Sequence, residues 1–259
     1  MAAVPLVLIA SVRSRGARIG WKREAALALA GFALAAHFAT WIASLLYTSV
    51  AISTLLVTTT PLWTSLYDLF VTRARPSRDF VVALALASAG AAAIAFARAG
   101  AAPVPGHALL GDALALIGGI AMGVYLIVVR RSGVTPSAGP ALSTTAIVAR
   151  TYSWAALTLL LATVPAHQPL PAFTNYAAWL GILGMGVFSQ LLGHTALNAA
   201  LRDFSASIVA MSTLIEPLAA AILAALLFGE ALSAQTIAGG LAVLAAVALS
   251  LGRQRVIFT

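Results

Sequence analysis

Apolar segments of membrane-spanning length recur along almost the whole chain, and they constrain its fold more than any other feature. A helix needs roughly 17 to 25 mostly apolar residues to cross a bilayer, and only 8% of the 259 residues are charged. The segments leave no room for a separate aqueous domain, so the sequence predicts an all-α, polytopic membrane helical bundle. Eight segments are long enough to cross: 25–47, 49–71, 80–97, 113–129, 143–164, 177–201, 205–228 and 232–252. A ninth, Ala2–Ser11, is too short.

The net charge of +8 comes from residues in the short segments between apolar runs, which is a membrane-topology signal rather than a nucleic-acid-binding face. If Ala2–Ser11 ends in the cytoplasm and every later segment crosses, thirteen basic residues face inward and only Arg98 faces outward. We therefore expect a multi-pass protein of a bacterial-type cytoplasmic (inner) membrane with a cytoplasmic carboxyl terminus. The inward set is Arg13, Arg15, Arg18, Lys22, Arg23, Arg73, Arg75, Arg78, Arg130, Arg131, Arg202, Arg253 and Arg255.

The chain also carries an internal repeat at an offset of 156 residues. The offset aligns Ser49 with Ser205, Pro61-Leu62 with Pro217-Leu218, and Ser77 with Ser233. The second copy begins near Leu109, and 109 minus 156 is −47, so the first copy lacks one span and part of another. We predict a first repeat in residues 1–100, incomplete at its amino end, and a second in residues 101–259. A complete unit of five spans is odd in number, which predicts oppositely inserted copies in a ten-span plan. Either Met1 is a late start or an amino-terminal segment is absent.

Two stretches resemble the EamA-type branch of the drug/metabolite transporter superfamily. They are Leu46-Tyr47-Thr48-Ser49-Val50-Ala51 with Thr60-Pro61-Leu62, and Glu216-Pro217-Leu218 with Phe228-Gly229-Glu230-Ala231-Leu232. The resemblance implies two five-helix repeats and export of amino acids, metabolites or toxic compounds. One departure is that Arg73-Ala74 stands where the second repeat has Gly229-Glu230. Another is the missing first span, which would line the central cavity in the family.

Glu216 is the leading candidate for proton coupling. It lies mid-span directly before Pro217, and proline loosens a helix because it cannot donate a backbone hydrogen bond. Low dielectric favours the neutral form of a carboxyl group, which would allow proton exchange during a transport cycle. The alternative is a buried structural acid. Asp68, about one turn from the cytoplasmic end of its span, is a second candidate and could form an inner-gate ion pair.

Polar side chains at helical spacing predict a substrate pathway. His37, Trp41 and Ser44 share one helical face with Thr48, and Gln190, His194 and Asn198 form a similar stripe. The repeat pairs Thr60 with Glu216, and Tyr125 could stack on a flat solute. The alternative is that these groups only join helices by hydrogen bonds. Arg150, inside a span, could pair with an acid or with a substrate carboxylate.

The favoured function is a secondary active exporter of small amphipathic metabolites such as amino acids, working by alternating access. The alternative is a nontransporting structural subunit or a truncated relative. An intramembrane enzyme is disfavoured because no nucleophile or metal-binding motif occurs. We expect a small-molecule substrate and the lipid bilayer as partners, with no cofactor, no metal and no nucleic acid. The oligomeric state stays open, a monomer included.

Overall fold

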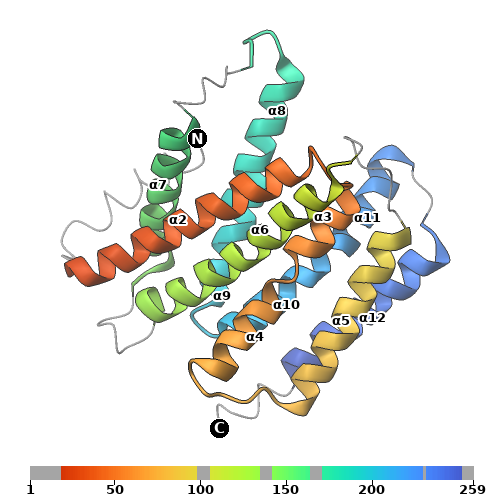
Figure 1. The fold of residues 1–259 in the computed structure, drawn as a ribbon, viewed down its shortest axis with the longest axis horizontal. Coiled ribbons are helices and arrows are strands. Elements are labelled where there is room, and N and C mark those ends of the chain that lie inside the picture. The colour runs from red at the N-terminus through yellow and green to blue at the C-terminus, as the bar shows by residue number, and fades with distance from the viewer. Residues whose placement is uncertain (1–18, 98–105, 135–141, 164–170, 230–231, 253–259) are drawn as a thin grey trace. The chain divides into compact units, whose positions relative to one another are not determined.

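The computed structural model describes residues 19–97, 106–134, 142–163, 171–229 and 232–252, and every regular element within them is a helix (Figure 1). The predicted all-α fold is confirmed, and each of the eight predicted spans coincides with a helical segment. Ala2–Ser11 lies outside the described residues. The elements are α2 (Trp21–Ser44), α3 (Val50–Val57), α4 (Thr60–Phe70), α5 (Arg78–Ala97), α6 (Ala108–Val129), η1 (Arg130–Val134), α7 (Thr144–Thr163), α8 (Tyr176–Gly184), η3 (Met185–His194), α9 (Thr195–Ala200), α10 (Ala206–Ser212), η4 (Thr213–Ile215), α11 (Glu216–Phe228) and α12 (Ala234–Gly252).

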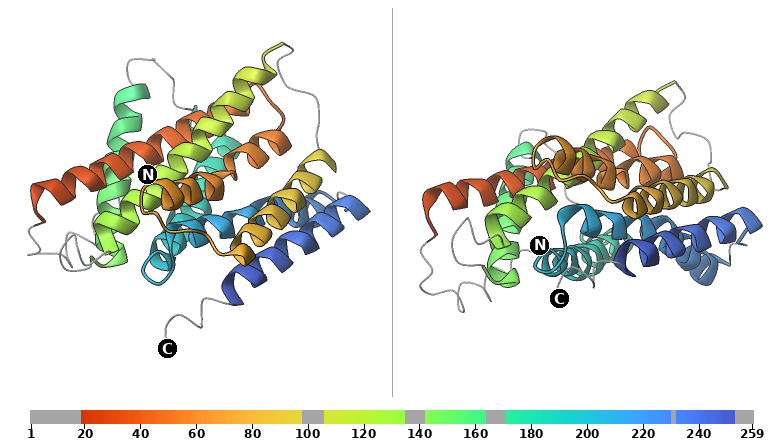
Figure 2. Two further views of the ribbon diagram at one scale, coloured as in Figure 1. Left: turned by 60° about the horizontal axis from the view of Figure 1, so that its bottom comes forward. Right: turned by 90° about the horizontal axis from the view of Figure 1, so that it is seen from below.

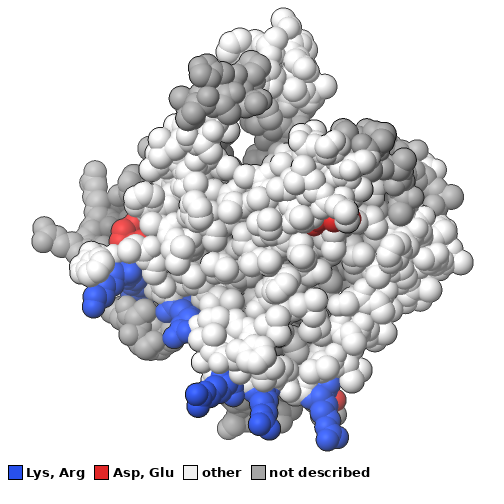
Figure 3. Space-filling view, viewed as in Figure 1, with Lys and Arg blue, Asp and Glu red and all other residues white. Residues whose placement is uncertain are grey.

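Six helical segments in the described part of the chain are long and apolar enough to cross a membrane. They are Trp21–Ser44, Arg78–Ala97, Ala108–Gly133, Thr144–Thr163, Tyr176–Ala200 and Ala206–Leu227. The apolar helix Ala234–Ser250 is slightly shorter. The remaining predicted span, residues 49–71, is divided into α3 and α4. Most of the surface visible in Figure 3 carries no charged side chain, as expected for helices that meet lipid.

The chain forms two compact units. Unit 1 contains Met1–Ala36 and Val124–Ser205, and unit 2 contains His37–Gly123 and Ala206–Thr259. Each unit therefore draws segments from both predicted repeats. The predicted repeats, residues 1–100 and 101–259, were defined by matching positions in the sequence, whereas the two units are defined by contacts in space. The repeat boundaries therefore stay a prediction.

The core of unit 2 is the contact between α5 and α12, which lie side by side in Figures 1 and 2. The two helices run antiparallel, because Gln235 at the start of α12 donates to the carbonyl of Ala93 near the end of α5 at 3.0 Å. Glycines allow the backbones to touch: a Cβ on Gly90 would lie 2.5 Å from the Gly239 oxygen, and one on Gly239 would lie 2.6 Å from the Gly90 oxygen. Close approach through small residues is how membrane helices commonly associate.

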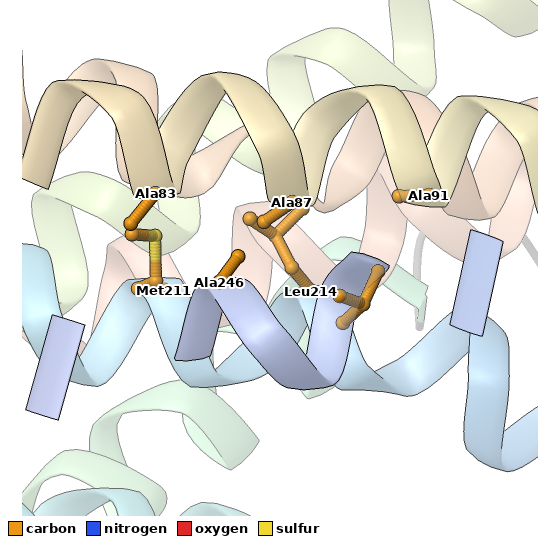
Figure 4. Packing of buried hydrophobic residues seen from close by; sticks show 7 residues of the cluster. Ala83, Ala87, Ala91, Met211, Leu214 and Ala246 are labelled. Atoms are coloured by element: carbon orange, nitrogen blue, oxygen red, sulfur yellow. The ribbon is translucent and has the colours of Figure 1, made fainter. Parts of the chain in front are cut away.

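Buried side chains extend this core toward α10 and η4. Figure 4 shows Ala83, Ala87 and Ala91 of α5 pointing toward Met211, Leu214 and Ala246. Alanines on α5 leave room for the longer methionine and leucine, so large and small side chains interdigitate. Apolar packing of this kind stabilises membrane helices mainly through van der Waals contact.

Corresponding helices of unit 2 begin at positions that differ by the repeat offset. Val50 and Ala206 begin α3 and α10, Thr60 and Glu216 begin α4 and α11, and Arg78 and Ala234 begin α5 and α12; 206 − 50, 216 − 60 and 234 − 78 each equal 156. Both broken spans therefore break at equivalent points. Antiparallel packing of the equivalent helices α5 and α12 is what oppositely inserted copies predict, while the inverted repeat as a whole stays a prediction.

Proline explains the position of both breaks. Pro61 and Pro217 are the second residues of α4 and α11, where a missing amide hydrogen is tolerated only because a new helix begins. At the first break Thr60 donates at 3.0 Å to the carbonyl of Val57, which Pro61 leaves without its usual amide partner. Next to the second break Thr213 donates to the Ala210 carbonyl at 2.7 Å. Such bonds satisfy backbone groups that lipid cannot.

Unit 1 is held together by a close helix contact and by charged side chains at one end of it. A Cβ on Gly31 of α2 would lie 2.4 Å from the Trp154 Cβ of α7. Arg150 Nε donates to Glu24 Oε2 at 3.1 Å, and Trp154 Nε1 donates to Glu24 Oε1 at 2.9 Å. Arg23 donates to the carbonyls of Ser132 and Gly133 in η1, the segment that follows α6. The predicted pairing of Arg150 with an acid is confirmed.

Candidate functional site

In unit 2 the predicted polar face of α2 meets α6. His37 is buried, and its Nδ1 lies 3.0 Å from the carbonyl oxygen of Gly118. Its ring stacks on Trp41 at a centroid distance of 5.9 Å. The spacing of four residues thus places both rings on one face, as predicted. Gly119 and Gly123 of α6 give close approach to α3 and α4, since a Cβ on Gly119 would lie 2.8 Å from the Val57 oxygen.

The predicted pathway hydroxyls of unit 2 are bonded within the protein. Ser44 donates to the Trp41 carbonyl at 2.6 Å, and its Oγ lies 2.6 Å from that of Ser53. Thr60 donates to the carbonyls of Val57 at 3.0 Å and Gly119 at 3.2 Å. Both residues are buried. Their geometry matches the alternative in which polar groups join helices, and a pathway role for them stays a prediction.

Glu216 differs from these residues because its carboxylate makes no hydrogen bond or ion pair with any residue that the structure describes. It is the first residue of α11 and lies within the span Ala206–Leu227. Its side chain is exposed on the face that also carries Ala219, Ala220 and Leu223, while the adjacent Pro217 is buried. A carboxylate without a partner inside an apolar span requires a proton, a cation or water to compensate it.

Asp68 is bonded rather than ion-paired. The Ser207 hydroxyl of α10 donates to Asp68 Oδ2 of α4, joining the two broken spans of unit 2. Within the described ranges no ion pair involves Asp68, so the predicted inner gate has no basic member there. Its carbonyl also accepts from the Thr72 hydroxyl at 2.7 Å, which closes the carboxyl end of α4.

A second polar group lies inside unit 1. Asn198 of α9 is fully buried, and its Nδ2 donates to Tyr125 Oη at 2.6 Å and to the His194 carbonyl at 2.7 Å. Asn198 Oδ1 has no hydrogen-bond partner among the described residues. Tyr125 is also fully buried. The structure thus brings the predicted pathway residue Tyr125 together with two others, His194 and Asn198, that lie about 70 residues later in the sequence.

Tyr152 completes this group and was not predicted to belong to it. Its hydroxyl lies 3.3 Å from the Gln190 carbonyl oxygen and 3.3 Å from Thr195 Oγ1, and the residue is buried. Aromatic residues inside membrane helices usually serve as packing or interface anchors, and Tyr152 was assigned to that class. The available signal was its neighbour Thr151, because consecutive hydroxyl-bearing residues inside an apolar helix require partners.

The stripe Gln190–His194–Asn198 is carried by unusual backbone. Residues 185–194 form the π-helix η3, and α9 follows directly. In a π-helix each amide bonds to the carbonyl five residues earlier, and such segments are frequent at functional sites. His194 Nδ1 lies 3.0 Å from the Ser189 carbonyl oxygen, five residues back. No residue of η3 is buried, whereas Asn198 is.

Asp112 is a third polar feature, and it was not among the residues predicted from the sequence. The predicted span began at residue 113, but α6 begins at Ala108, so Asp112 lies inside the helix. Its Oδ1 is buried and has no hydrogen-bond partner in the described part of the chain. The signal that could have found it is an acid followed immediately by an uninterrupted apolar run. No group of three or more metal-ligating side chains occurs among the described residues.

These features define a multi-pass helical membrane protein with hydrogen-bonded and unpartnered polar groups inside its spans. The family model of EamA-like transporters matches residues 109–252. The chain belongs to the EamA-like transporter family, within the drug/metabolite transporter superfamily, whose members are transporters rather than enzymes.

The fold is also found among solved structures, of which 28 chains match. One, described only as the crystal structure of a protein, superposes with a TM-score of 0.76 at 16% identity over 100% of this chain and 86% of its own. Identity this low shows likeness of fold alone. No curated protein matches the chain.

Proposed function

We propose that this protein is a secondary active exporter of small amphipathic metabolites such as amino acids, and that proton exchange at Glu216 couples its cycle. It would work by alternating access around a mid-membrane site. The distribution of basic residues supports a bacterial-type cytoplasmic membrane location with the carboxyl terminus inside.

The observation that carries the proposal is the unpartnered carboxylate of Glu216 at a helix break. Asp68, the other acid considered for coupling, is bonded to Ser207, whereas Glu216 has no described partner to hold it in one charge state. A membrane potential of about 100 mV adds about 2.3 kcal/mol per charge moved. Coupling to one proton would therefore support substantial accumulation of solute.

The equivalent breaks at Thr60-Pro61 and Glu216-Pro217 support alternating access. Broken spans in transporters expose backbone groups to solutes and ions and provide points where half-helices can reorient. Only the second break carries a carboxyl group, since Thr60 occupies the equivalent position in the first. Proton exchange at one break and hydroxyl bonding at the other would give the two repeats different roles.

The proposal is tested with the full chain in proteoliposomes. Export of labelled amino acids is measured with and without an imposed pH gradient, for the parent chain and for Glu216→Gln. We expect Glu216→Gln to retain exchange of labelled for unlabelled solute and to lose accumulation driven by the gradient. Asp203→Asn, which removes an exposed acid between two spans, is the control and should behave as the parent.

Gradient-driven accumulation by Glu216→Gln at the parent level would show that coupling does not pass through this residue. Absence of any flux of the whole amino-acid panel in the parent chain would contradict the proposed substrate class. That second outcome would favour the alternative of a nontransporting subunit.

A further inference from the structure

The position of Asp112 in unit 2 is fixed by tight backbone packing. The preceding residue, Gly111, meets the carboxyl end of α2: a Cβ there would lie 2.7 Å from the Thr48 amide nitrogen. Asp112 itself is half-buried, with Oδ1 sealed from solvent. The carboxylate is therefore held against neighbouring helices, yet the residue keeps an open side from which a solute could approach.

No described element around Asp112 supplies a compensating charge. The segments of unit 2 that pack along α6 are His37–Thr48, α3 and α4, and neither they nor α6 contain lysine or arginine. Besides Asp112, the ionisable side chains of these segments are His37, Tyr47, Tyr67, Asp68 and Tyr125, and His107 directly precedes α6. By contrast, Glu24 at the charged end of unit 1 is paired with Arg150. An acid left unpaired within a span is costly and typically marks a functional position.

Trp41 provides a second unmatched group on the facing helix. Its Nε1 is buried and has no hydrogen-bond partner among the described residues. Trp41 is one turn from His37, whose ring contacts the Gly118 carbonyl of α6, and one turn from the buried Ser44. The indole therefore lies on the face of α2 that meets α6 at His37 and α3 at Ser44. The α2–α6 pair holds one charged acceptor and one donor that the described protein leaves unused.

We infer that Asp112 and Trp41 bind the head group of a zwitterionic solute, with the ammonium on the Asp112 carboxylate and the solute carboxylate accepting from Trp41 Nε1. This inference rests on the proposed function and specifies how amino acids would be recognised. The ammonium group of the solute supplies the counter-charge that Asp112 lacks, and the carboxylate of the solute accepts the hydrogen bond that Trp41 Nε1 does not make within the described protein. The aromatic rings of Trp41 and Tyr47 suit a cation as well, because ring faces attract positive charge.

The test uses the full chain in proteoliposomes and exchange of the twenty common amino acids. For the amino acid with the largest flux, the corresponding amine and the corresponding deaminated acid are measured as inhibitors; for leucine these are 3-methylbutylamine and 4-methylpentanoate. Asp112→Asn should lower the apparent affinity for the amino acid and for the amine roughly tenfold or more, which is the effect of losing a charge-assisted hydrogen bond. Inhibition by the deaminated acid should be unchanged. Trp41→Phe keeps an aromatic ring but removes the indole N–H. It should lower the apparent affinity for the amino acid and for the deaminated acid, but not for the amine.

Two further variants and a stability measurement separate recognition from folding. Asp112→Glu should recover part of the amine inhibition, and Asp203→Asn should match the parent. Asp112→Asn should unfold at the parent temperature or above, since it removes an unpartnered charge. If Asp112→Asn unfolded at a lower temperature than the parent and lost inhibition by the amine and by the acid equally, Asp112 would have a structural role and the inference would be overturned. Unchanged amine inhibition in Asp112→Asn, with the parent active, would overturn this inference alone, whereas an inactive parent would overturn the proposed function as well.

Discussion

The contact between Gly90 and Gly239 predicts a large penalty for a very small change. In Gly90→Ala the new Cβ would lie 2.5 Å from the Gly239 oxygen, and ordinary contact begins near 3.4 Å, so α5 and α12 must separate by 3.4 − 2.5 = 0.9 Å locally. The obstacle is backbone, which cannot rotate away as a side chain can. Overpacking of this kind costs about 1–3 kcal/mol, against a gain of about 1 kcal/mol from replacing glycine in a helix. We expect Gly90→Ala to destabilise unit 2 by up to about 2 kcal/mol.

Gly181→Ala is the matched control. Gly181 lies in α8, and a Cβ there would meet nothing within 4 Å. The same substitution should therefore stabilise the protein by about 1 kcal/mol through helix propensity alone. Reversible unfolding in mixed micelles measures both variants. Gly239→Ala should resemble Gly90→Ala, and the double variant should cost less than the sum because the helices are already displaced.

A Gly90→Ala variant as stable as Gly181→Ala would contradict the predicted clash between the Gly90 and Gly239 backbones. That result would mean that α5 and α12 do not pack through their backbones. Their antiparallel contact would then no longer support the predicted relation between the two repeats.

Two further predictions concern the hydrogen bonds of unit 1. Tyr125→Phe removes the oxygen that accepts from Asn198, so it should lower the free energy of unfolding by about 1–2 kcal/mol through an unmet buried donor; a loss below about 0.3 kcal/mol would contradict that bond. Glu24→Gln and Arg150→Ala remove the two members of an ion pair that is partly exposed, and a double-mutant cycle should give a coupling of about 0.2–1 kcal/mol that falls with added salt; an additive cycle would show that the pair contributes nothing.

The helical segments were predictable because apolar runs and the charges between them depend on local sequence. The eight predicted segments coincide with helices, and Pro217 identified the place where its span loosens. The start of α6 was less predictable, since His107 and Asp112 resemble loop residues when the chain is read alone. In the structure Gly111 packs on the end of α2, and this contact extends the helix past both the glycine and the acid.

The candidate site was predictable by residue type but not by partner. The spacing of His194 and Asn198 indicated a shared helical face, yet nothing local pairs Asn198 with Tyr125, which lies 73 residues earlier. The π-helix η3 was also not predicted. No proline marks it, and its i to i+5 bonding depends on packing that only the fold supplies. Division into two compact units likewise depends on long-range contacts.

The π geometry of η3 gives its span a torsional joint. An α-helix advances about 100° per residue, so converting one wide turn to α geometry would turn α8 by roughly that angle while α9 stayed in place. The Asn198 bond to Tyr125 anchors the α9 side of this joint. No residue of η3 is buried, and its Gln190 carbonyl oxygen lies 3.3 Å from the Tyr152 hydroxyl. A change from π to α geometry in η3 would therefore rotate α8 (Tyr176–Gly184) about the axis of its span, while α9 stays bonded to Tyr125 through Asn198.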